Sequence, residues 1–112
     1  MSPDLEEAFH QDMLELYARA RDEVGYRASR YLQSVRRNGG KEAARRLLKP
    51  RKSDTSKGLD ALLSANRPDL TVEFLVLRPK YAELFTETER EEAKRRLALY
   101  RQEAERRAAE RT

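Results

Sequence analysis

Apolar residues recur at three- and four-residue steps along most of the chain, which is the spacing of one face of an α-helix. The first such series comprises Leu5, Phe9, Met13, Leu16, Tyr17 and Ala20. Ser2-Pro3-Asp4 precedes it with a hydroxyl N-cap, a proline at the first helical position and an acid at the positive end of the helix dipole. The pattern stops at Gly25, so the sequence predicts one long helix between these points.

Two shorter helices are predicted next. Their inward-facing residues are Ala28, Tyr31, Leu32 and Val35 in the first, and Ala43, Ala44, Leu47 and Leu48 in the second. Asn38-Gly39-Gly40 separates them, since glycine readily forms a left-handed helix cap. Pro50 prevents the second helix from continuing beyond about Lys49. Residues 50–56 are polar, basic and turn-rich, and are predicted as a loop.

The stretch 72–77 is ambiguous between strand and helix. Its Val and Phe content suits a strand, but the chain contains no second strand-like run to pair with it. We therefore predict a buried helix capped by Thr71. A brief helical turn with Leu59, Leu62 and Leu63 precedes it, and a short turn from Pro79 through Leu84 and Phe85 follows.

Thr86-Glu87-Thr88-Glu89 is a capping box and predicts the start of the longest helix. Its inner stripe is Ala93, Leu97, Tyr100 and Ala104, and its supporting four-residue pairs are Glu91–Arg95, Glu92–Arg96 and Glu103–Arg107. Beyond Tyr100 the apolar residues are only alanines. The predicted fold is an all-α, single-domain bundle of five or six helices with a long C-terminal helix. Residues 1–100 form the helical domain and 101–112 the solvated end of the last helix.

Charge is distributed unevenly along the 112 residues, although the net charge is only +4. Residues 26–58 hold eleven Lys or Arg and two acids, residues 1–25 have a net charge of −5, and residues 59–112 are neutral. The candidate nucleic-acid-binding residues in the basic segment are Arg27, Arg30, Arg36, Arg37, Lys41, Arg45, Arg46, Lys49, Arg51 and Lys52. Such a cluster attracts phosphates by charge neutralisation and counterion release, whatever the base sequence.

Residues 26–49 have the order helix, glycine-containing turn, helix, which is the outline of a helix-turn-helix. Few Asn or Gln stand at base-reading positions, so the expected partner is DNA or RNA bound without sequence specificity. The alternative is that these cations pair with the acids of the first helix, which is the commoner outcome for charged runs. Those acids are Glu6, Glu7, Asp12, Glu15, Asp22 and Glu23.

Candidate catalytic groups are few. The chain has no Cys and one histidine, His10, so it lacks the ligands of a transition-metal site. We expect His10 to form a surface pair with Glu6 or to hydrogen-bond another helix at the core edge. Glu73 is the best candidate for acid–base catalysis, yet its place after Thr71 equally suits the helix dipole. Asp69 is interpreted as a cap or as a partner of Arg67. We therefore predict no enzyme, no cofactor and no metal.

The pieces together resemble a family of short, uncharacterised bacterial proteins, related modules of which are associated with restriction-type nuclease proteins. They are Phe9-His10…Met13…Tyr17, Gly25-Tyr26…Tyr31-Leu32…Val35, Gly39-Gly40…Ala44-Arg45-Arg46-Leu47-Leu48, Arg67…Asp69-Leu70-Thr71-Val72-Glu73…Leu75-Val76-Leu77 and Tyr81…Leu84-Phe85-Thr86…Glu89…Ala93…Leu97. The resemblance covers roughly residues 8–100 and implies an all-helical bacterial module. It transfers no catalytic residue.

The resulting hypothesis is a non-enzymatic bacterial accessory module that binds nucleic acid, or a nucleic-acid-processing partner, through residues 26–58. The alternative is a protein–protein adaptor or antitoxin-like small protein in which the basic surface is incidental. A cytoplasmic location is expected, because the N-terminus lacks the apolar stretch of a secretion signal. No membrane partner is expected, since the longest apolar run is Phe74 to Leu77. The oligomeric state is left open.

Overall fold

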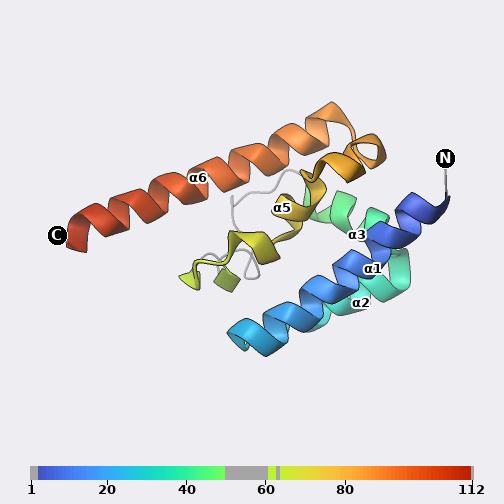
Figure 1. Ribbon diagram of the computed structural model, residues 1–112, viewed down its shortest axis with the longest axis horizontal. Helices are drawn as coiled ribbons and strands as arrows, with labels where there is room; N and C mark the ends of the chain where they lie inside the picture. The colour runs from blue at the N-terminus through green and yellow to red at the C-terminus, as the bar shows by residue number, and fades with distance from the viewer. Residues whose placement is uncertain (1–2, 50–60, 63, 112) are drawn as a thin grey trace.

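The computed structural model describes residues 3–49, 61, 62 and 64–111. Most of these residues are helical. Five α-helices with defined bounds, helical residues at 61, 62 and 64, and three 3-10 or π elements lie within these residues, and no strand does. The prediction of an all-α fold with a long C-terminal helix is confirmed (Figure 1).

The first predicted helix forms and ends at the predicted glycine. α1 (Pro3–Arg19) runs into a π-helical turn, η1 (Ala20–Val24). Gly25 then adopts a left-handed conformation with φ of +81°, and its N–H donates to the carbonyl of Arg21. That conformation suits a residue without Cβ, which explains why the helix stops there. The Ser2 cap lies outside the described residues.

The next two helices are joined by a single residue. α2 (Ser29–Asn38) and α3 (Gly40–Leu47) flank Gly39, which has φ of +87° and ψ of 155°. The predicted left-handed helical cap is therefore wrong in detail, because ψ is extended, although the positive φ still favours glycine. At Gly40 a Cβ would lie 2.7 Å from the Cα of His10, so this glycine permits the close approach of α3 to α1.

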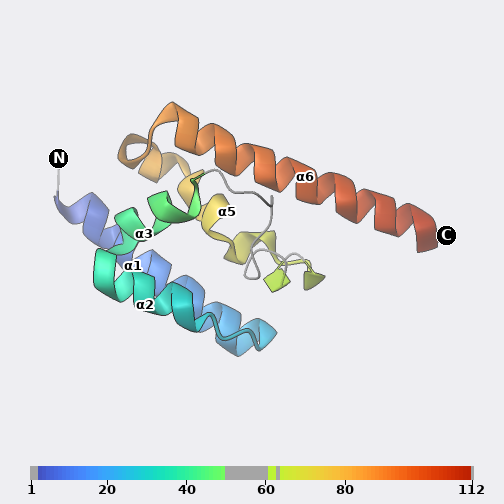
Figure 2. The same cartoon turned by 180° about the vertical axis from the view of Figure 1, so that it is seen from behind.

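The second half of the chain packs on this unit through short helices. Residues 61, 62 and 64 are helical and are followed by η2 (Pro68–Leu70), α5 (Val72–Val76) and η3 (Pro79–Leu84). α6 (Glu87–Arg111) then runs along α5, and its C-terminal turns extend past the other elements (Figures 1 and 2). The predicted helix at 72–77 is confirmed, and the Thr71 hydroxyl accepts from the N–H of Phe74 at 3.1 Å.

The aromatic part of the core lies where α1 meets η3 and the residue that follows it. The rings of Phe9 and Tyr81 pack edge to face at 4.9 Å, and those of Phe9 and Phe85 at 5.1 Å. The Tyr81 hydroxyl donates to Asp12 at 2.5 Å, which satisfies its one polar atom. One expectation for the 72–77 helix is wrong: Phe74 is 45% exposed, so this helix is not buried on every face.

Some predictions fall on residues that lie outside this description. They are the loop 50–56, the turn residues Leu59 and Leu63, the side chain of Ala104 and the pair Glu103–Arg107.

Candidate nucleic-acid interface

α2 carries three arginines and no acidic residue. Val35 is fully buried on its inner face. Arg30 and Arg37 are seven residues apart, so they project within about 20° of each other, on the side opposite Val35. Arg36 lies beside Arg37, and all three arginines are exposed. The inner face of α2 is therefore apolar, whereas its outer face is cationic.

Four of the predicted arginines make no ion pair within the described part of the chain. They are Arg27, in the segment before α2, and the three arginines of that helix. Lys49, just past α3, is likewise exposed without an ion pair among these residues, but it lies between α3 and α6, where its carbonyl accepts from Arg96. Within the described residues, no carboxylate neutralises these five charges.

The cations of α3 are engaged more fully. The Nε of Arg45 lies 2.7 Å from Glu89 of α6, and the Nε of Arg46 lies 3.2 Å from Glu42 on the same helix. The hydrogen bond and charge of Glu89 raise the pKa of Arg45. Lys41 is 3.8 Å from Glu6 of α1, a long and partly exposed pair. Arg51 and Lys52 lie outside the described residues.

The acidic first helix contributes little to this pairing. Within the described residues, Glu6 is the one N-terminal acid paired to a predicted site residue. Asp12 accepts from Tyr81 and lies 3.9 Å from Arg78. Asp22 pairs with the neighbouring Arg21. The N-terminal acids therefore leave the arginines of α2 uncovered.

A second network holds the end of η1 against η2. Glu23 accepts from Arg19 at 2.9 Å and from Arg67 at 2.7 Å. Arg67 also forms two hydrogen bonds with Asp69, which confirms that predicted pair. The hydrogen bonds from Arg67, opposed by partial burial, lower the pKa of Asp69. These acids are thus committed to joining two segments of the fold.

The arrangement departs from the helix-turn-helix outline. A helix-turn-helix uses a turn of three or four residues, whereas Gly39 alone separates α2 from α3. α3, which would be the recognition helix, packs against both α1 and α2 and is tied to α6 through Arg45. α2 lies at the edge of the molecule (Figure 2). The more accessible cations are therefore on the first helix of the pair.

A depression of about 680 Å³ lies between α3 and α6. Its lining alternates in sign, with Arg45, Lys49 and Arg95 among the four carboxylates of Glu42, Glu89, Glu91 and Glu92. Such a mixed lining offers no net field for an anion. The depression therefore adds nothing to the candidate interface on α2.

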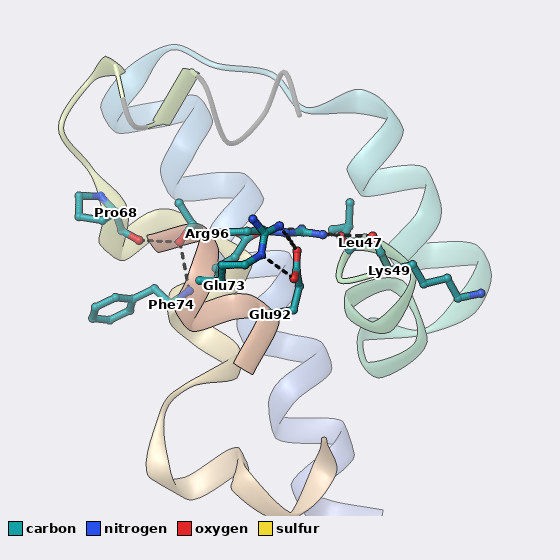
Figure 3. Close-up of polar contacts among 9 residues, drawn as sticks. Leu47, Lys49, Pro68, Glu73, Phe74, Glu92 and Arg96 are labelled. Carbon is teal, nitrogen blue, oxygen red and sulfur yellow. Dashed lines mark hydrogen bonds and ion pairs between the residues drawn. The ribbon is translucent and has the colours of Figure 1, made fainter. Parts of the chain in front are cut away.

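The predicted catalytic candidates have structural partners. The Nδ1 of His10 accepts from the backbone N–H of Gly40 at 2.9 Å, which confirms the predicted bond across the core edge. Glu73 is 6% exposed and pairs with Arg96 at 3.0 Å (Figure 3). Both side chains therefore hold helices together.

The predicted pair Glu92–Arg96 is confirmed, but sequence reasoning missed the burial of Arg96, which is 7% exposed. Besides Glu73, its guanidinium binds Glu92 at 2.7 Å and the backbone carbonyls of Leu47 and Lys49 (Figure 3). A signal was present: Arg96 lies three residues after the buried Ala93, on the inner face of α6. A cation at that position needs buried acceptors.

Within the described residues, no group of three or more His, Asp or Glu side chains is placed to hold a metal ion. No helix in that part of the chain is both long enough and apolar enough to cross a membrane.

Comparison of the chain with known protein families, curated proteins and solved structures found no match. The resemblance to the bacterial family therefore stays a prediction.

Proposed function

We propose that the chain is a non-enzymatic bacterial accessory module, working in the cytoplasm, that binds nucleic acid or a nucleic-acid-processing partner. The binding surface is centred on α2 and consists of Arg27, Arg30, Arg36 and Arg37. We call these four residues the α2 surface.

One observation carries the proposal. The four cations are exposed and make no ion pair in the described part of the chain, while the acids of α1 pair elsewhere or face solvent. Unpaired, clustered cations attract phosphates because binding releases the counterions condensed on the nucleic acid. Arg45 and Arg46 contribute less, since each already has a carboxylate partner.

A fluorescence anisotropy titration at low salt tests this function with a labelled 20-base-pair duplex and a single strand. Arg36→Glu with Arg37→Glu should abolish binding, because the change replaces two cations of the α2 surface by two anions. Lys80→Glu with Arg101→Glu is the matched control, because both residues are exposed outside that surface and the charge change is identical. Absence of binding by the unaltered protein at low salt would remove the proposal.

The alternative, a protein–protein adaptor or antitoxin-like protein, has its own supporting observation. Phe74 is 45% exposed and Leu99 40% exposed, and α6 extends past the rest of the molecule (Figure 1). A pull-down from the native cells decides between the two functions. Stoichiometric recovery of one protein after nuclease treatment supports the adaptor, whereas loss of the recovered material on that treatment supports nucleic-acid binding.

A further inference from the structure

The position and size of α2 suit a more specific contact with nucleic acid than attraction between charges alone. α2 packs on α1 and α3 and lies at the side of the molecule away from α6 (Figures 1 and 2). An α-helix with its side chains is about 10–12 Å across, and the major groove of B-DNA is about 12 Å wide. A peripheral helix with a free, acid-free face therefore has the dimensions and charge to enter that groove.

A neutral residue lies among the cations of this face. Gln33 is three residues after Arg30 and four before Arg37, so the three side chains share one face. It is exposed, and its amide makes no hydrogen bond within the described part of the chain. By contrast, Ser34 on the flank accepts from Asn38 at 3.2 Å. The amide of Gln33 thus keeps both its donor and its acceptor available.

We propose that α2 is the helix that enters the major groove of duplex DNA, with Arg30, Gln33 and Arg37 at the base edges. Arg27 and Arg36 then lie at the flanking phosphates. This inference rests on the proposed function. It specifies duplex DNA as the ligand, the major groove as the place of contact and Gln33 as a residue that reads the bases.

The chemistry of the three side chains matches the groove. Arginine pairs with the O6 and N7 of guanine, and glutamine with the N6 and N7 of adenine. Arg30 and Arg37 are about 10 Å apart along the helix axis, which corresponds to about three base pairs at 3.4 Å each. A-form RNA has a major groove too narrow for side chains to read. Duplex DNA is therefore the preferred ligand.

The reading role of Gln33 separates this inference from a purely electrostatic surface. A field of charges is indifferent to the loss of a neutral amide and tolerates duplex RNA as well as duplex DNA. A helix seated in the groove is sensitive to both changes.

The test uses the full chain and a pool of DNA duplexes with a randomised central segment. Bound duplexes are recovered over several rounds, and the best one is titrated by anisotropy beside an RNA duplex of the same sequence. We expect enrichment of guanine and adenine within a window of about three base pairs, and binding of the RNA duplex at least about tenfold weaker.

The matched variants are Gln33→Ala and Gln102→Ala, which both remove an exposed glutamine from a helix. Gln33→Ala should weaken binding to the selected duplex about tenfold and erase the preference for adenine, while Gln102→Ala should change neither. Alanine favours the helix, and circular dichroism checks that both variants remain folded.

The outcomes separate the two claims. If the unaltered protein binds no nucleic acid at low salt, the proposed function and this inference both fail. If it binds, but the pool shows no enrichment, the RNA duplex binds equally, or Gln33→Ala behaves as the unaltered protein, then α2 does not read the groove and the proposed function stands.

Discussion

Arg96 shows how much a single residue contributes to this small fold. It lies on α6, where it pairs with Glu92 one turn earlier. It connects this helix with α5 through Glu73 and with the C-terminal end of α3 through the carbonyl of Leu47 at 2.7 Å. The last carbonyls of a helix have no partner within the helix, so the guanidinium also caps α3. Buried charge is costly unless it is paired, and here Arg96 has both carboxylate and carbonyl acceptors.

Replacing Arg96 by methionine should lower the free energy of unfolding by about 3–5 kcal/mol, because Glu73 would stay buried without a partner. Arg95→Met is the matched control, since Arg95 is the next residue and its side chain is 47% exposed. The control should cost less than about 1 kcal/mol. Urea titrations followed by circular dichroism measure both values, and similar losses in the two variants would contradict this role of Arg96.

Glu92 makes the stability depend on pH in acid. Hydrogen bonds from Arg95, opposed by partial burial and reinforced by Arg96, lower the pKa of Glu92 from 4.5 to about 2. The unfolded chain therefore takes up a proton at higher pH than the native carboxylate does. The stabilisation is complete above about pH 4.5 and is lost as the pH falls towards 2.

The measurement is the unfolding free energy of the unaltered protein minus that of Glu92→Gln. This difference should be constant above pH 4.5 and shrink by about 1–3 kcal/mol as the pH approaches 2. Glu91→Gln is the control, because Glu91 is 62% exposed and pairs with Lys94 at 3.6 Å. A difference for Glu92→Gln that does not change with pH would refute the assignment.

Among the elements, α6 has the best-defined start. The N–H of Thr86 donates to the Glu89 carboxylate at 2.9 Å, and the N–H of Glu89 donates to the Thr86 hydroxyl at 3.1 Å. This confirms the predicted capping box. Burial raises the pKa of Glu89, but the Thr86 N–H and Arg45 outweigh it, so the pKa is lowered overall.

Thr86→Ala should therefore destabilise the protein by about 1 kcal/mol, because one N–H of the first turn of α6 loses its acceptor. Thr88→Ala is the comparison, since Thr88 is exposed two residues later in the same turn. It should cost less than about 0.5 kcal/mol. Thermal melts of both variants measure the effect, and equal shifts in Tm would show that the cap contributes nothing of its own.

The ends of the elements were predictable because local chemistry decides them. Gly25 has the positive φ that ends a helix, and the hydroxyl of Thr71 caps α5 in spite of the strand-forming residues that follow. The exposure of Phe74 and the burial of Arg96 were not predicted. Both depend on which neighbouring helix covers which face, and that is a property of the whole packing.

At the scale of the whole molecule, the basic segment is divided between two helices. The sequence correctly predicts that Lys41 and Arg45 lie on one helix and Arg30 and Arg37 on another. It is wrong in placing Arg27 and Lys49 on these helices, because Arg27 precedes α2 and Lys49 follows α3. It could not predict that α3 turns Arg45 towards Glu89, 44 residues along the chain. The α2 surface consequently holds four cations without a carboxylate partner in the described chain, and our account depends on that surface being open to an outside polyanion.

The salt dependence of the anisotropy titration with duplex DNA tests this claim most directly. If all four cations of the α2 surface neutralise phosphates, the slope of log K against log salt should be about −3.6. It should fall to about −1.8 in the variant with Arg36→Gln and Arg37→Gln and stay unchanged with Lys80→Gln and Arg101→Gln. No binding at low salt, or the same slope in all three proteins, would contradict the account.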